Sequence, residues 1–209
     1  KKYPCPEQNS SGSRSRISFG ASAINKCGIV GAGVMGSGIA QVLSYNDIPV
    51  IVKDINVRVL KRSIRAIKDI FKYAVRKKKI DKSHVGGKLK LISFTLTYKG
   101  FEDAGLVIEA AAEDLNIKQR IFKDLEKVAP QGAVFASNTS SFSIQKIADV
   151  IDSPERLVGL HFFNPVHRMG LVEVVKSDNT SDEALAVVIE FASRIGKIPI
   201  VVKDVPGFL

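Results

Sequence analysis

The chain of 209 residues carries 31 basic against 21 acidic side chains, a formal net charge of +10, and 45% of its residues are hydrophobic. This length and apolar content suffice for one sizeable core, or for one domain with an appendage. No apolar run approaches the ~18 residues of a transmembrane helix, and two cysteines make no disulfide framework. These features exclude the membrane-spanning and disulfide-stabilised classes of protein.

Residues 1–24 are rich in serine, glycine and basic side chains and include Pro4 and Pro6. They lack the apolar segment of a secretory signal, and Glu7 together with the missing amphipathic pattern argues against a transit peptide. We interpret 1–24 as a flexible linker or tail that follows another segment. We expect the folded domain to cover 25–204. Because 201–209 stops just after a turn signal, we expect 205–209 to begin a further domain.

The first structured segment joins a short apolar run to a glycine pattern. Residues 27–30 are apolar, Gly31, Gly33 and Gly36 follow as Gly-x-Gly-x-x-Gly, and residues 37–45 have helical spacing. Gly31 permits a tight strand-to-helix turn, Gly33 lets a pyrophosphate approach the backbone, and Gly36 lets the helix pack closely on the strand. The N–H groups and positive dipole of the helix N-terminus attract phosphates. The pattern predicts a dinucleotide site.

A second apolar run, 48–52, ends just before Asp54, which comes eighteen residues after Gly36. The Asp54 carboxylate can accept hydrogen bonds from the adenosine ribose hydroxyls, which favours NAD over NADP. A Gly-x-Gly-x-x-Gly pattern alone also occurs in ordinary turns. A strand before it, a helix after it and an acid at this distance make NAD the expected cofactor.

The positive charge is concentrated between residues 53 and 82, where twelve Lys or Arg side chains stand against three Asp. Apolar residues recur there at helical spacing and predict an amphipathic helix over 57–80 with a strongly basic face. Most of these charges are typical of a solvated helix surface. The alternative is a surface for a polyanion, either a nucleic acid or the phosphates of a nucleotide-tailed substrate. No helix-turn-helix, zinc pattern or aromatic interleaving supports nucleic acid as the main partner.

The rest of the chain alternates strand and helix patterns. Further strands are predicted near 90–95, 105–111, 133–137, 156–162, 171–176 and 197–203. Further helices are predicted near 115–128, 143–150 and 182–195. This alternation predicts an α/β fold of Rossmann type, with a mainly parallel sheet, helices on both faces and the cofactor at the carboxyl edge.

Polar residues gather at that same edge. Residues 137–141 (Ser-Asn-Thr-Ser-Ser) follow one predicted strand, and His161 lies at the end of the next. Oxidation of an alcohol by nicotinamide needs a base for the hydroxyl proton, and histidine titrates in the useful range. Glu173 is an acid in an apolar run and so needs a partner. A turn between two neighbouring strands would place Glu173 beside His161 as its orienting acceptor.

A histidine on an apolar strand is more often structural than catalytic. Glu173 and the nucleotide site on the same sheet reverse that preference for His161. His84 and His167 lack such a setting, and we interpret them as surface or loop residues.

Five spaced motifs carry a resemblance to a known family. They are Gly-Ala-Gly-Val-Met-Gly at 31–36, Ile-Glu-Ala-Ala-Ala-Glu at 108–113, Ala-Ser-Asn-Thr-Ser-Ser at 136–141, His-Phe-Phe-Asn-Pro at 161–165 with Leu-Val-Glu at 171–173, and Lys-Asp-Val-Pro-Gly-Phe at 203–208. Over about residues 25–209 the chain resembles the L-3-hydroxyacyl-CoA dehydrogenases of fatty-acid β-oxidation. The resemblance implies oxidation of (S)-3-hydroxyacyl-CoA to 3-oxoacyl-CoA with NAD, and an acyl-CoA as substrate.

The resemblance also implies residue roles. His161 would be the general base, Glu173 its orienting partner, and Ser140 would hydrogen-bond the substrate oxygen near the nicotinamide ribose. The NAD-binding set would be Gly31, Gly33, Met35, Gly36, Asp54, Ala111, Ala112, Glu113, Lys118, Ser140 and Asn164. Lys77 falls at a position resembling a CoA-contacting lysine. Ile70 replaces a neighbouring serine of the family pattern, which weakens the CoA assignment.

Residues 52–56 and 161–169 resemble most closely the multifunctional enzymes in which an enoyl-CoA hydratase domain precedes this one. The resemblance further implies a helical C-terminal domain, absent from this chain, that mediates dimerisation and covers the substrate. We expect an intracellular protein, cytoplasmic in preference to mitochondrial or peroxisomal, with no nucleic-acid partner and no metal. The remaining alternatives are a related NAD-dependent hydroxyacid dehydrogenase with a lysine base, and a basic nucleic-acid-binding domain.

Overall fold

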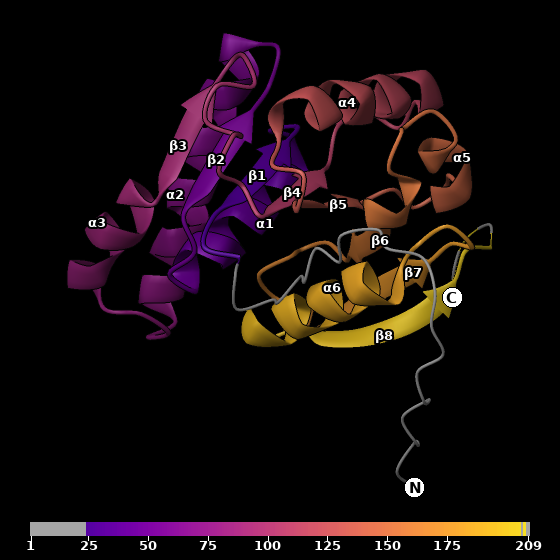
Figure 1. The fold of residues 1–209 in the computed structure, drawn as a ribbon. Helices are drawn as coiled ribbons and strands as arrows, with labels where there is room; N and C mark the ends of the chain where they lie inside the picture. Colours follow the sequence, from indigo (N-terminus) through magenta and orange to yellow (C-terminus); the bar gives the residue numbers. More distant parts are fainter. Residues whose placement is uncertain (1–23, 206, 208–209) are drawn as a thin grey trace, which may run out of the picture.

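The computed structural model describes residues 24–205 and 207 (Figure 1). One eight-stranded sheet has the order β3-β2-β1-β4-β5-β6-β7-β8. The strands are β1 (Cys27–Val30), β2 (Val50–Lys53), β3 (Ile92–Thr95), β4 (Leu106–Glu109), β5 (Val134–Ser137), β6 (Leu157–Phe162), β7 (Leu171–Lys176) and β8 (Ile198–Lys203). Strands β1 to β6 pair in parallel, whereas β7 is antiparallel to β6 and parallel to β8. The predicted Rossmann-type, mainly parallel sheet is confirmed.

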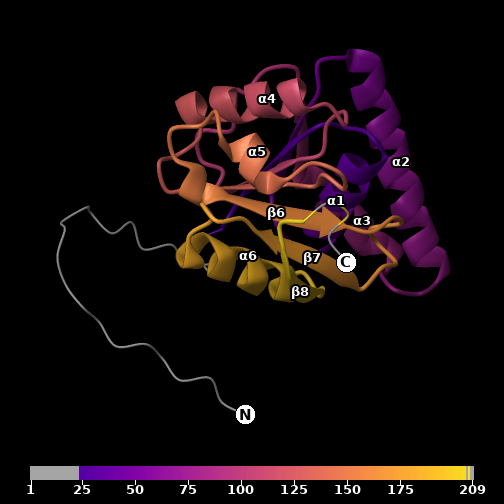
Figure 2. The ribbon, with the colours of Figure 1, turned by 90° about the vertical axis from the view of Figure 1, so that its right-hand side faces the viewer.

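Helices cover both faces of this sheet (Figure 2). They are α1 (Val34–Tyr45), α2 (Val57–Arg76), α3 (Lys82–Lys90), α4 (Leu115–Val128), α5 (Ile144–Ala148), the 3-10 turn η2 (Pro154–Arg156) and α6 (Asp182–Arg194). Helices α1, α2 and α6 share one core cluster, and α4 and α5 share the other. Strand β4 shows why both cores form, because Leu106 and Ile108 enter the first and Val107 enters the second.

The strand order places a crevice at the carboxyl end of β1. Strand β1 lies between β2 and β4, so the chain leaves β1 toward one side and returns to the other. In open sheets of this kind, ligands bind outside the carboxyl ends of the strands at such a switch point. The turns after β1, β2, β4, β5 and β6 therefore determine the site.

The predicted helix over 57–80 is too long by four residues, and a second helix that was not predicted follows it. Helix α2 ends at Arg76, and Lys78 has a φ of 56°, which breaks the helical path. Helix α3 then begins at Lys82. It contains Gly86 and Gly87 and buries no residue fully, so neither propensity nor periodicity indicates it. Its Val85 and Leu89 nevertheless pack against the core.

Ile24, the last residue of the predicted tail, packs with the folded domain. Ile24 is buried in the core, and its carbonyl accepts a hydrogen bond from Arg194 Nη1 at 3.0 Å. The rest of the predicted tail, 1–23, lies outside the described residues. Among the described helices, none is both long and apolar enough to cross a membrane.

Candidate functional site

The Gly-rich turn joins β1 to α1 and leaves an open approach to the helix N-terminus. Gly31 has a φ of 105°, and a Cβ there would collide with the backbone of Ala110. A Cβ at Gly36 would collide with the carbonyl oxygen of Gly31. Gly33 is the N-cap of α1, and no atom lies within 4 Å of where its Cβ would be. Backbone N–H groups at such a terminus can therefore meet a phosphate directly.

Asp54 follows β2 and is held against this turn. Its Oδ2 accepts a hydrogen bond from the Ala32 backbone N–H at 2.9 Å, and its Oδ1 accepts one from Asn56 N at 3.1 Å. The carboxylate is partly buried and faces a cavity beside the turn. This position suits a group that binds ribose hydroxyls next to a pyrophosphate.

The cavity has a volume of about 850 Å³ and extends from the Gly-rich turn to α4. Its lining combines the ends of β1 and β2 with the segment between β4 and α4. Six residues predicted for NAD binding line it: Gly31, Gly33, Met35, Asp54, Ala111 and Ala112. The structure thus brings together residues that are up to 81 positions apart in the sequence.

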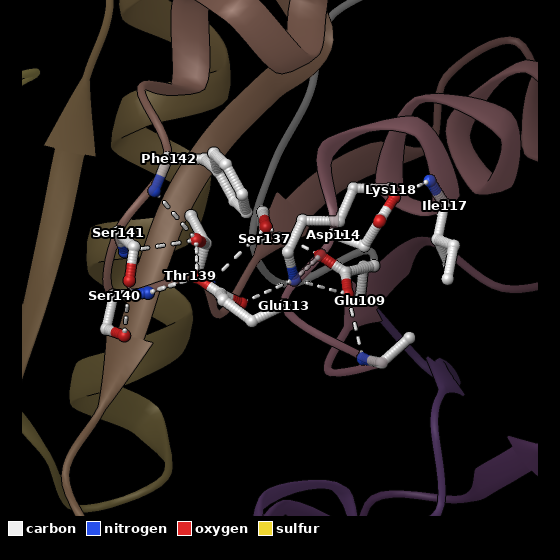
Figure 3. A network of polar contacts seen from close by, with 11 residues as sticks. Glu109, Glu113, Asp114, Ile117, Lys118, Ser137, Thr139, Ser140, Ser141 and Phe142 are labelled. Carbon is white, nitrogen blue, oxygen red and sulfur yellow. Dashed lines mark hydrogen bonds and ion pairs between the residues drawn. The ribbon is translucent and has the colours of Figure 1, made fainter.

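A buried ion pair joins β4 to α4 and belongs to a network of polar contacts (Figure 3). Glu109 ends β4 and is fully buried, and Lys118 of α4 is 1% exposed. The Lys118 Nζ lies 2.9 and 3.0 Å from the two carboxylate oxygens of Glu109. Ser137 Oγ and Ala111 N also donate to this carboxylate, at 2.7 and 2.8 Å. A buried carboxylate needs such hydrogen-bonding partners. Through these contacts Glu109 of β4 is bonded to both α4 and β5.

Glu113 extends this network to Ser140. Lys118 Nζ lies 3.1 Å from Glu113 Oε2. The hydroxyl of Thr139 and the backbone N–H of Ser140 both donate to Glu113 Oε1. Burial raises the pKa of Glu113, but the Thr139 hydrogen bond and the charge of Lys118 outweigh it and bring the pKa below its usual value. Glu113 is therefore ionised at neutral pH, and it holds the exposed Ser140 at the sheet edge.

His161 and Glu173 face each other across β6 and β7. They are register partners in the antiparallel pair, and His161 Nδ1 lies 2.5 Å from Glu173 Oε2. Glu173 is 2% exposed, whereas the side chain of His161 is 18% exposed. The carboxylate therefore orients the ring from the buried side, and the ring remains accessible from the sheet edge.

Asn138 supports the backbone beside His161. The β5–β6 ladder ends at Ser137 and Gly159, so among the described residues no strand pairs with the following part of β6 on that side. Asn138 Oδ1 accepts a hydrogen bond from Phe162 N at 2.9 Å and takes the place of the missing ladder bond. The loop after β6 packs closely on α1. A Cβ at Gly38 of α1 would lie only 2.9 Å from the side chain of Val166 in this loop.

Eight predicted site residues do not line this cavity, namely Gly36, Lys77, Glu113, Lys118, Ser140, His161, Asn164 and Glu173, and two of them also lie apart from the polar contacts described above. Asn164 is exposed in the loop after β6, and Lys77 is exposed at the C-cap of α2. The Nζ of Lys77 lies 5.9 Å from the ring centroid of Tyr73. Neither residue lines the cavity that contains Asp54.

Sequence reasoning missed three residues of this site, namely Glu109, Asn138 and Thr139. The signal for Glu109 was present, because an acid in an apolar strand needs a partner. The same signal singled out Glu173. For Asn138 and Thr139 the sequence offered only their place after a strand, and their partners, Phe162 in β6 and Glu113 before α4, are distant in the sequence.

Comparison with known proteins identifies relatives of the whole described region. The family described as "3-hydroxyacyl-CoA dehydrogenase, NAD binding domain" matches residues 26–205. The fatty acid oxidation complex subunit alpha of Psychrobacter sp. (strain PRwf-1) is 41% identical over 186 residues, which is 89% of this chain and 26% of that protein. The protein of the same name from Acinetobacter baumannii (strain SDF) is 40% identical over 91% of this chain and 26% of its own length.

Solved structures give the same result. The (S)-3-hydroxybutyryl-CoA dehydrogenase PaaH1 from Ralstonia eutropha has a TM-score of 0.86 and 36% identity, covering 89% of this chain and 66% of that one. FadB2 of M. tuberculosis has a TM-score of 0.86 and 38% identity over the same shares. The chain thus spans about a quarter of the length of the curated relatives and about two thirds of these solved chains.

Proposed function

The chain belongs to the family of 3-hydroxyacyl-CoA dehydrogenase NAD-binding domains, and from this premise we propose that its site oxidises (S)-3-hydroxyacyl-CoA to 3-oxoacyl-CoA. The observation that carries the proposal is the His161–Glu173 pair, which lies on the same sheet as the Gly-rich turn and Asp54. NAD would supply the acceptor for the hydride that leaves the alcohol carbon. A base must then take the hydroxyl proton, and His161 is the proposed base.

The other residues of the site would bind the cofactor, orient the His161 ring and polarise the substrate oxygen. Glu173 would hold the His161 ring and stabilise the imidazolium that forms when the ring takes the proton. Ser140 would donate a hydrogen bond to the substrate oxygen, from a position that Glu113 fixes through the Ser140 backbone. The Gly-rich turn would bind the pyrophosphate and Asp54 the adenosine ribose. Lys118 would act through Glu113, and Asn164 would complete the nicotinamide end.

The direct test is acetoacetyl-CoA-dependent consumption of NADH by the full-length natural protein. Turnover that requires both substrates would support the proposal. A protein that binds NADH but reduces a short oxoacid to a hydroxyacid, in preference to acetoacetyl-CoA, would instead favour assignment to the related hydroxyacid dehydrogenases.

We also propose that the chain works within a larger protein carrying an enoyl-CoA hydratase domain and a dimerising helical domain. This follows from its share of the relatives' length.

We expect NADH to bind more tightly than NADPH, by roughly tenfold or more, because Asp54 would lose a charge-assisted contact and repel a 2′-phosphate. The nearby cations Lys53 and Arg58 would reduce this difference in affinity, Arg58 more than Lys53, because the Lys53 ammonium lies over the Tyr98 ring. Fluorescence titration of the protein with each cofactor measures the difference. Asp54→Asn should narrow it, whereas Asp69→Asn on the exposed face of α2 should not. Equal affinities in the wild type would remove this role from Asp54.

We expect the basic end of α2 to contribute to CoA affinity. Lys77→Glu reverses an exposed charge and should weaken acetoacetyl-CoA binding several-fold while NADH binding is unchanged, because Lys77 does not line the cofactor cavity. Lys123→Glu, an exposed charge reversal on α4, is the matched control. Isothermal titration with both ligands is the measurement. Loss of DNA or RNA binding in Lys77→Glu, with both ligands unaffected, would instead favour the polyanion alternative.

A further inference from the structure

The sequence motif at 203–208 contains an aspartate to which the proposed function gives no role. Asp204 directly follows β8 and is half-buried. Its Oδ1 accepts a hydrogen bond from the backbone N–H of Ile144 at 2.9 Å. Its Oδ2 accepts one from the backbone N–H of Gln145 at 2.8 Å and one from Ser143 Oγ at 2.7 Å. Asp204 therefore binds the N-terminus of α5, although 60 positions of sequence separate it from Ile144.

Helix α5 is too short to hold its first turn by itself. It has five residues, and isolated helices shorter than ~12 residues are marginal in water. The first N–H groups of a helix have no intrahelical partner. In α5, Ser143 Oγ accepts the N–H of Lys146 at 3.3 Å, and the two N–H groups before it are those that donate to Asp204. Asp204 thus fixes the place where α5 begins.

The loop before α5 carries the serine that the proposed function places at the substrate oxygen. We call this loop, residues 138–143 between β5 and α5, the serine loop. At its β5 end, Glu113 accepts the N–H of the exposed Ser140, and the buried Thr139 accepts the next two N–H groups through its Oγ1 (Figure 3). At its α5 end, the last residue of the loop donates its hydroxyl to Asp204. The serine loop is therefore held at both ends by carboxylates from other parts of the sequence.

We propose that Asp204 is a positioning residue for the dehydrogenase reaction and acts through the serine loop on Ser140. A donor misplaced by about 1 Å can cost up to ~10²-fold in rate, so the anchor of its loop affects turnover. Asp204 does not line the cofactor cavity, so its effect falls on the substrate oxygen and not on NAD. This inference rests on the proposed function, because it takes Ser140 as the donor to that oxygen. It goes further in giving the end of β8, an edge strand of the sheet, a part in the reaction.

The test is a double-variant cycle in the full-length natural protein. Asp204→Asn keeps the size of the side chain but replaces one acceptor oxygen by an amide group, so at least one of the three hydrogen bonds is lost. It should lower kcat with acetoacetyl-CoA by roughly tenfold. NADH affinity, measured by fluorescence titration, should change by about twofold or less. Ser140→Ala removes one donor, a loss of typically about 10²- to 10³-fold that leaves turnover measurable. Adding Asp204→Asn to Ser140→Ala should cost about twofold or less, because the group that Asp204 positions is already gone.

The matched control is Ser181→Ala, which removes the cap of another helix. Ser181 Oγ accepts the N–H of Ala184 at the start of α6, at 3.1 Å. This variant should lower the melting temperature, as Asp204→Asn does, but leave kcat unchanged. Hydrogen exchange of the serine loop should become faster in Asp204→Asn and not in Ser181→Ala. If Asp204→Asn does not fold, Ser143→Ala takes its place, with a smaller loss of kcat and the same dependence on Ser140.

An equal loss of kcat from Asp204→Asn with and without Ser140 would overturn the positioning role and leave the proposed function standing. Unchanged kcat in a folded Asp204→Asn variant would have the same meaning. Unchanged hydrogen exchange of the serine loop would show that Asp204 does not hold it. A wild type that does not reduce acetoacetyl-CoA with NADH would overturn the proposed function, and the role of Asp204 in that reaction with it.

Discussion

Replacing His161 by alanine should lower kcat of the full-length protein by about 10²- to 10⁴-fold, which is the usual cost of losing a general base. NADH affinity should change little, because His161 does not line the cofactor cavity. The comparison is of steady-state rates with acetoacetyl-CoA, alongside fluorescence titration with NADH. Near-normal turnover in a folded His161→Ala variant would end the assignment of this histidine as the base.

Glu173→Gln should act in the same direction as His161→Ala. Glutamine keeps the size of the buried side chain but removes the charge that lies 2.5 Å from His161 Nδ1. The ring would lose its orientation, and the imidazolium formed during turnover would lose its stabilising partner. Glu190→Gln on the exposed face of α6 is the matched control. A control variant that loses as much activity as Glu173→Gln would point to a general effect of charge.

The part of the fold that follows from sequence is the part with strong local patterns. Apolar runs bounded by turn signals located the strands of the sheet, and the glycine spacing located the turn after β1. The family predicted from five motifs is confirmed. Helix α3 was missed because its stability comes from contacts of Val85 and Leu89 with other helices. Such contacts leave no periodic trace in a segment that contains two adjacent glycines.

Part of the site could be predicted, namely where a charged residue in an apolar run requires a polar partner. A carboxylate in an apolar run must have a partner, and this need alone directed attention to Glu173. Lys53 shows the limit of such reasoning. Its charge was counted with the basic surface of residues 53–82, yet the strand turns it into the cofactor cavity against Tyr98. Strand register determines this direction, and charge counting along the sequence does not report it.

Breaking the buried Glu109–Lys118 ion pair should lower the stability of the fold markedly. Lys118→Met should lower the free energy of unfolding by about 3–5 kcal/mol, because it leaves the fully buried Glu109 carboxylate without its cation. Urea denaturation followed by circular dichroism gives this value. Lys123→Met lies on the exposed side of the same helix and should change the free energy of unfolding by about 0.5 kcal/mol or less.

A double variant separates the loss of the ion pair from the loss of packing. If the cost of Lys118→Met is an uncompensated buried charge, then Glu109→Leu combined with Lys118→Met should be more stable than Lys118→Met alone, since the unpaired carboxylate is gone. Some cost should remain, because Glu113 also loses Lys118, and Ser137 and Ala111 lose their acceptor. NADH binding by the double variant should also weaken, because Glu113 would no longer be held in place. A double variant less stable than Lys118→Met would show that the pair stabilises the fold through packing and hydrogen bonds and not through charge compensation.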